Sequence, residues 1–140
     1  MRRIIGIGSP FGADQLGWRA VDLLQATPPA NTEMLKLDRP GSLLIRYFSE
    51  VADLVLIDAV QAGREPPGTP IRLELRELAA AGCRTSTHGF GVVEALQMAR
   101  QLGLMPDKLL LIGIETGPDL SILPEIESAR LLRLFESHLG

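Results

Sequence analysis

The residues from Ala52 to Val60 read ADLVLIDAV, the most continuous apolar run in the first half of the chain. A run that is apolar on both faces is typical of a central strand in a parallel sheet, where helices cover both faces. Asp58 interrupts this run near its end. Because an uncompensated buried carboxylate is costly, Asp58 is expected at an open strand end or in a functional pocket.

Further strands are predicted on both sides of this run. Two short apolar stretches indicate buried strands, Arg2–Gly8 and Lys108–Ile114. Two alternating stretches indicate half-exposed strands, Thr32–Leu37 and Ile71–Leu75. Four helices are predicted from apolar residues at helical spacing or from turn residues at the ends of a stretch. They are Asp14–Gln25, Leu43–Glu50, His88–Leu102 and Pro124–Leu139. Pro124 suits the first turn of the last helix.

Helices and strands therefore alternate along most of the chain. This order predicts an α/β fold with three α/β/α layers around a mostly parallel, twisted five-stranded sheet with one antiparallel strand. Its 140 residues suit a single domain spanning residues 1–140. Aromatic residues make up only 4%, so the core is expected to consist of Leu, Ile, Val and Ala.

Composition narrows the possible partners and compartments. A net charge of −3 argues against nucleic acid as the primary partner, because a phosphate-binding surface needs a basic excess. The one cysteine, Cys83, cannot form an intrachain disulfide, which fits a reducing compartment. No signal-peptide pattern opens the sequence and no apolar run reaches about 18 residues. We expect a cytoplasmic protein without a membrane span.

Polar residues concentrate where the predicted strands end. In open α/β sheets, ligands bind beyond the carboxyl ends of the strands. If the strands are parallel and adjacent, that edge collects Asp14, Asp38, Asp58, His88 and Glu115. Two carboxylates and an imidazole, from Asp14, Asp58 and His88, would offer oxygen and nitrogen ligands to nickel or zinc and leave coordination positions open.

Each of these residues also has a simpler interpretation. Asp14 could cap a helix or interact favourably with its dipole, and His88 could hydrogen-bond locally at a helix start. His138 is expected to be a solvated residue at the end of the last helix. Cys83 is interpreted as a small loop residue, because no base can be assigned to it.

The glycine-rich loop from Gly6 to Gly12 invites comparison with a phosphate cradle. A dinucleotide site requires G-x-G-x-x-G, whereas here the third glycine comes one position late and Pro10 removes a backbone donor. Asp38 could serve as the ribose carboxylate, so a nucleotide site stays open as the minor alternative. The absence of HExxH excludes a zincin site, and the absence of G-x-S-x-G disfavours an α/β-hydrolase serine.

Four motifs, in order along essentially the whole chain, resemble those of the hydrogenase maturation endopeptidases. They are the opening glycine loop with the first helix, an apolar strand ending in D-A, a T/S-x-H helix start and a late strand of the type L-x-G-I-E. In this chain they are Gly6–Ser9 with Gly12–Val21, Leu54–Val60, Ser86–Gly91 and Leu111–Glu115. Two residues depart from the family pattern, because Ser9 replaces the usual Asn and Ala13 replaces the first of two acids. The loop is also one residue short.

The resemblance implies that Asp14, Asp58 and His88 are both the catalytic and the metal-binding residues. It implies a nickel-dependent, aspartyl-type endopeptidase that removes a C-terminal extension from the large-subunit precursor of a [NiFe] hydrogenase after nickel insertion. Nickel would arrive with this precursor, and no tightly bound organic cofactor is expected. We expect a monomer, because the contact with one large substrate is transient. The alternatives are a metal- or nucleotide-binding module without peptidase activity and a divergent precursor-binding chaperone.

Overall fold

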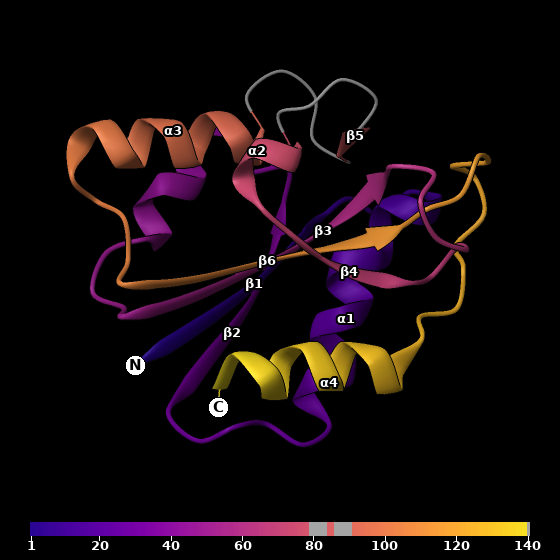
Figure 1. Ribbon diagram of the computed structural model, residues 1–140, viewed down its shortest axis with the longest axis horizontal. Helices are drawn as coiled ribbons and strands as arrows, with labels where there is room; N and C mark the ends of the chain where they lie inside the picture. Colours follow the sequence, from indigo (N-terminus) through magenta and orange to yellow (C-terminus); the bar gives the residue numbers. More distant parts are fainter. Residues whose placement is uncertain (79–83, 86–90, 140) are drawn as a thin grey trace.

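The computed structural model describes residues 1–78, 84–85 and 91–139. The main strands lie in the order β2-β1-β3-β6-β4 (Figure 1). They are β2 (Thr32–Asp38), β1 (Arg2–Gly8), β3 (Asp53–Gln61), β6 (Lys108–Glu115) and β4 (Pro70–Leu73). Only β4 runs antiparallel among these five, which confirms the expected mostly parallel sheet. A sixth strand that was not predicted, β5 (Arg84–Thr85), pairs antiparallel with β3.

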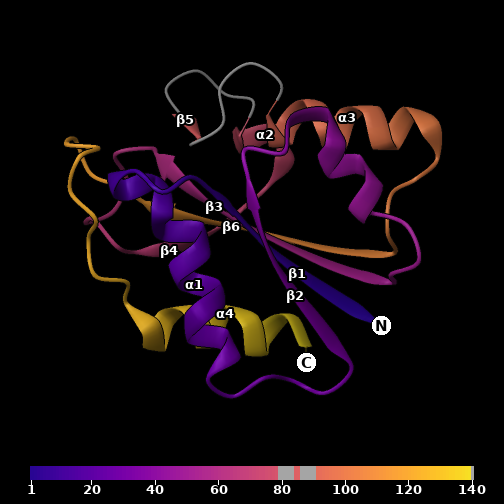
Figure 2. The same cartoon turned by 180° about the vertical axis from the view of Figure 1, so that it is seen from behind.

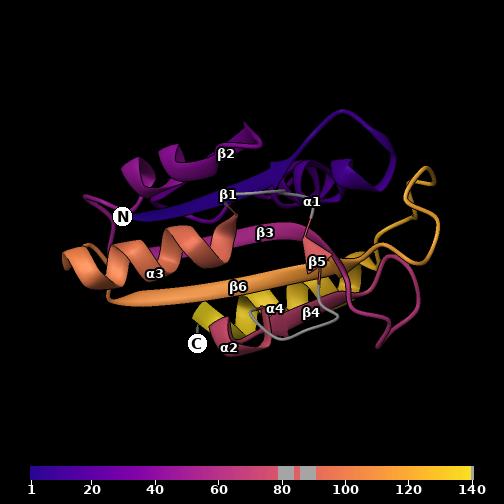
Figure 3. The same ribbon diagram turned by 90° about the horizontal axis from the view of Figure 1, so that it is seen from above.

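Helices cover both faces of the sheet, as Figures 2 and 3 show from two further directions. One face carries α1 (Leu16–Gln25) and α4 (Ser128–Leu139). The other carries α3 (Val92–Leu102) and the 3₁₀ helix η2 (Gly41–Tyr47). The short helices η1 (Gly12–Gln15) and α2 (Leu75–Leu78) precede α1 and follow β4.

The central strand β3 divides its side chains between the two cores. Its odd-numbered apolar residues pack with α1 and α4, and its even-numbered ones pack with α3 and η2. Burial on both faces explains why the sequence of β3 is apolar without alternation. Since Asp58 is even-numbered and successive side chains point to opposite faces, its carboxylate belongs to the α3 side.

The approach of α1 to the sheet depends on a glycine. A side chain at Gly17 would place its Cβ 2.3 Å from the carbonyl oxygen of Ile7 and 2.7 Å from that of Ile57. Only a residue without a Cβ permits this contact between the helix and the β1 and β3 backbones. The position of α1, and of the loop that leads into it, is thereby fixed against the centre of the sheet.

Several predicted boundaries were wrong. The last helix begins at Ser128 rather than at Pro124, because residues 124–127 run beside Gly68, whose backbone accepts a hydrogen bond from the Glu127 amide at 3.0 Å. The strand expected over residues 71–75 ends at Leu73. The helix expected over residues 43–50 is the 3₁₀ helix η2. The described part of α3 begins at Val92, and the expected start at His88 lies outside the described residues.

The amino edge of the sheet carries a buried ionic cluster of Arg2, Asp53 and His138. Asp53 accepts a hydrogen bond from Arg2 Nε at 2.9 Å and lies 2.6 Å from His138 Nε2. The prediction that His138 is solvated was therefore wrong, since its side chain is only 7% exposed. Burial alone would raise the pKa of Asp53, but the hydrogen bonds from His138 and Arg2 outweigh it and lower that pKa.

Within the described ranges, none of the helices combines the length and the apolar character that a membrane crossing requires.

Candidate active site

The loop after β1 delivers Asp14 to the carboxyl edge of the sheet. The Ser9 amide donates a hydrogen bond to the Asp14 carbonyl oxygen at 3.1 Å, and the Ser9 hydroxyl donates to Asp14 Oδ2, also at 3.1 Å. Ser9 is only 1% exposed, whereas Asp14 is half-buried. The loop therefore ties the backbone and side chain of Asp14 to a buried residue and leaves part of the carboxylate accessible.

Helix capping does not account for Asp14. It lies within the 3₁₀ helix η1, and the residue before α1 is Gln15, whose side chain makes no capping hydrogen bond. The preceding residue, Ala13, is fully buried in the core beneath α1. A small apolar residue suits this buried position. An acid, which the resemblance would place at position 13, is absent, so Asp14 is the acidic residue of the loop from Ser9 to Gln15.

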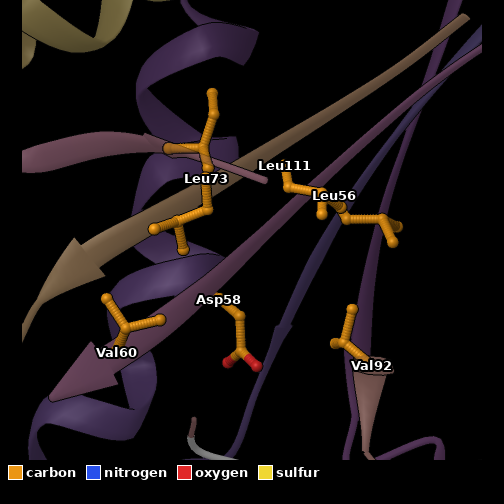
Figure 4. A pocket seen from close by; sticks show the side chains of 7 residues that line it. Leu56, Asp58, Val60, Leu73, Val92 and Leu111 are labelled. Carbon is orange, nitrogen blue, oxygen red and sulfur yellow. The ribbon is translucent and has the colours of Figure 1, made fainter. Parts of the chain in front are cut away.

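Asp58 lies in β3 among aliphatic side chains and is 6% exposed. Figure 4 shows its carboxylate in a small cavity lined by side chains from β3, β4, β6 and the first residue of α3. Its Oδ1 accepts a hydrogen bond from the Ala59 amide at 2.8 Å. A carboxylate in such an apolar setting interacts strongly with any cation that reaches it, because the local dielectric is low.

Asp58 lies within β3, and Asp14 lies in η1, on the loop after the neighbouring parallel strand β1. Gly6 of β1 is in register with Ile57 of β3, so Asp58 follows one residue beyond the last paired position. The 3₁₀ helix that holds Asp14 contacts β3. The structure thus places both predicted acids on the carboxyl side of two neighbouring strands, Asp58 within β3 and Asp14 beyond the end of β1.

The third predicted residue, His88, lies outside the described residues, as does Cys83. In the part of the chain that the structure describes, no three His, Cys, Asp or Glu side chains gather closely enough to hold a metal ion. A three-residue metal site that includes His88 therefore stays a prediction. Asp38 is less suited to bind a metal at this site, because it forms an exposed ion pair with Arg39 at 2.7 Å.

Glu115, at the end of β6, was expected among the ligand-binding residues of this edge, but its contacts show that it stabilises a neighbouring segment of backbone. It is 1% exposed, and its two carboxylate oxygens accept hydrogen bonds from the amides of Ala62 and Arg64 at 3.0 and 3.1 Å. Those amides belong to the segment that follows β3. Glu115 therefore fixes the chain just beyond Asp58, a structural role that its position at a strand end did not reveal.

The glycines of the opening loop serve close packing. A Cβ at Gly6 would lie 2.3 Å from the Gly17 carbonyl oxygen, and a Cβ at Gly8 would lie 2.3 Å from the Asp14 carbonyl oxygen. The space beside each glycine is thus filled by the backbone of this chain. This arrangement favours a packing role over a phosphate cradle and weakens the nucleotide-site alternative.

Comparisons with known proteins agree on one family. The model of the hydrogenase maturation protease family matches residues 19–129. The hydrogenase expression/formation protein HupD of Thiocapsa roseopersicina is 36% identical over 117 residues, which cover 80% of this chain and 52% of HupD. The hydrogenase 2 maturation protease of Escherichia coli is 26% identical over 132 residues, covering 89% of this chain and 80% of that protease. The chain thus spans about half the length of HupD.

Solved structures show the same fold. An endopeptidase from Escherichia coli has a TM-score of 0.72 and 25% identity, covering 98% of this chain and 89% of its own. The hydrogenase maturating endopeptidase HybD from Escherichia coli has a TM-score of 0.69 and 21% identity, covering 97% of this chain and 88% of its own.

Proposed function

The chain belongs to the hydrogenase maturation protease family, and from this premise we propose that it is an endopeptidase for a [NiFe] hydrogenase. Its substrate is the large-subunit precursor, from which it removes a C-terminal extension once nickel has been inserted. It acts in the cytoplasm as a monomer.

The observation that carries this proposal is the placement of Asp58. Its carboxylate is 6% exposed in an aliphatic cavity, and Asp14 lies on the loop after the neighbouring parallel strand. This edge, beyond the carboxyl ends of parallel strands, is where open α/β sheets bind their ligands. A cation brought by the substrate would meet two carboxylates there, both of them oxygen donors.

Asp14, Asp58 and His88 are the proposed ligands and catalytic residues. Oxygen and imidazole donors suit a borderline divalent metal such as nickel. When bound, nickel would polarise the scissile carbonyl or lower the pKa of a water molecule. The chain's own contribution is to orient the substrate through Asp14, held by Ser9, and to provide a carboxylate able to accept a proton from the attacking water.

The decisive experiment mixes the purified chain with nickel-loaded and nickel-free large-subunit precursor and measures product masses. We expect one cut, in the loaded precursor alone. Cleavage of both forms would show that the chain does not require nickel in the precursor. If no loaded precursor is shortened, the protease proposal is wrong, and stable binding without cleavage would indicate a precursor-binding chaperone instead.

Single substitutions test the site. Asp14→Asn, Asp58→Asn and His88→Gln are each expected to abolish processing, because each removes a donor while preserving side-chain size. Circular dichroism and the melting temperature should show that the fold remains. Asp107→Asn is the matched control, since Asp107 is exposed in the loop before β6 at the opposite edge. Processing by all three site variants at the control rate would show that the site lies elsewhere.

A further inference from the structure

Three large apolar side chains are exposed on the two loops at the carboxyl edge. Phe11 is 66% exposed, Ile122 is 58% exposed and Leu120 is 48% exposed. Phe11 belongs to the loop after β1, and the other two belong to the loop after β6. Single exposed apolar residues are common, but several together on one surface indicate an interaction site. We name Phe11, Leu120 and Ile122 the apolar rim.

Backbone contacts hold the two loops of the apolar rim together. The Ala13 amide donates a hydrogen bond to the Leu120 carbonyl oxygen at 2.9 Å. Gly12 has a φ of +51°, and a Cβ there would lie 2.3 Å from that same oxygen. The backbone that follows Phe11 is therefore held against the backbone of Leu120, in a contact that only glycine permits.

The loop after β6 is further braced from within. Asp119 Oδ1 accepts hydrogen bonds from the Ser121 amide at 3.0 Å and from the Ser121 hydroxyl at 2.7 Å. The Ile122 amide donates to the Asp119 carbonyl oxygen at 3.3 Å. This tight turn presents Leu120 and Ile122 on a preformed surface, which lowers the entropy cost of binding a partner.

The apolar rim is continuous with the candidate active site. The Asp14 amide donates a hydrogen bond to the Phe11 carbonyl oxygen at 3.0 Å, so Phe11 stands at the start of the same short helix. Phe11 therefore lies within one turn of the residue proposed to orient the substrate. Within residues 9–13 and 117–122, the only charged side chain is Asp119. The surface therefore suits an apolar peptide segment and offers no basic group for a phosphate.

We propose that the apolar rim binds an apolar side chain of the hydrogenase precursor, in the segment that flanks the scissile bond. This inference rests on the proposed function. A second copy of the chain is the less suitable occupant, because a partner covering the apolar rim would also cover Asp14 and close the site to its substrate. The apolar rim thus contributes part of the substrate affinity, in addition to the proposed metal ligands Asp14, Asp58 and His88.

Steady-state cleavage of nickel-loaded precursor by Phe11→Ser and Ile122→Ser tests this inference. Each variant should raise KM about tenfold and leave kcat near the wild-type value, because a contact shared by ground state and transition state is lost. Leu102→Ser is the matched control. Leu102 is 62% exposed at the end of α3, near the amino edge, and its loss should leave both constants unchanged.

The outcomes separate the two proposals. If the wild-type chain cuts the precursor and both rim variants match Leu102→Ser, the inference is overturned while the proposed function stands. If the wild-type chain cuts no precursor, the proposed function fails and the inference fails with it. Analytical ultracentrifugation adds a further outcome, since a wild-type dimer that Phe11→Ser dissociates would assign the apolar rim to self-association and overturn the inference.

Discussion

Two aspartates of the same strand, Asp53 and Asp58, show how surroundings decide what a residue does. Asp53 opens β3 and is hydrogen-bonded to both Arg2 and His138. Asp58 lies five residues later among aliphatic side chains. The first carboxylate is hydrogen-bonded by two side chains from distant parts of the chain and stabilises the fold. The second lies where the proposed function requires a donor for an external cation.

Replacement of Asp53 should make the protein less stable at neutral pH and less sensitive to acid. Its lowered pKa means that the stabilisation is present above the unfolded value of about 3.9 and is lost as pH falls through the folded value. Asp53→Asn should cost roughly 2 kcal/mol at pH 7, because Arg2 and His138 lose a charged partner.

Urea unfolding between pH 7 and pH 2.5 measures this effect. The difference between Asp53→Asn and wild type should shrink in the acid range, and the exposed control Asp107→Asn should show little difference at any pH. A constant difference down to pH 2.5 would contradict the assigned role of the Asp53 charge.

At the element scale, strands were predicted better than helix ends. The strand Arg2–Gly8 was predicted to the residue, and β3 to within one residue at each end, because local apolar runs reveal buried strands. The start of α4 was misjudged, since the contact of residues 124–127 with Gly68 is tertiary and leaves no local signal. The two-residue β5 is likewise too short to predict.

The residues of the candidate site were predictable from the sequence, but the contacts that hold them in place were not. Placement at or beyond strand ends singled out Asp14 and Asp58, and the structure places Asp58 within β3 and Asp14 in η1, after the neighbouring strand β1. The hydrogen bond from Ser9 to Asp14 depends on the path of the loop, which the residue pattern does not encode. The same holds for His138, which lies 85 residues from its partner Asp53.

Glu115 is expected to control the order of the segment after β3. Glu115→Ala would leave the amides of Ala62 and Arg64 without their carboxylate partner, at a cost of roughly 2–4 kcal/mol. Limited proteolysis should then cut residues 62–68 faster than in wild type. The exposed Glu125→Ala serves as the control, and equal cutting rates in the two variants would contradict the role assigned to Glu115.

At the scale of the whole molecule, the stabilising ionic cluster and the candidate site lie at opposite edges of the sheet. The buried cluster of Arg2, Asp53 and His138 holds the amino edge. The candidate site and the apolar rim lie at the carboxyl edge. Two apolar layers, one on each face of β3, connect the edges, so the scaffold for the site depends on both layers being intact.

Both layers should unfold together. The single tryptophan, Trp18, donates a hydrogen bond from Nε1 to the Leu37 carbonyl oxygen at 3.0 Å and so reports the contact between α1 and β2. Circular dichroism reports all the helices. We expect both probes to give the same midpoint in urea, as in two-state unfolding. Separate midpoints would show that one layer unfolds independently.

The contacts of Arg2 and His138 with one carboxylate also bring the first strand and the last helix together, as their marked ends show in Figure 1. A resin or sensor chip coupled through either end of the described chain would therefore hold the molecule by its amino edge. The opposite edge would face the solution, so immobilised protein should capture precursor from a flowing sample without blocking its own binding surface.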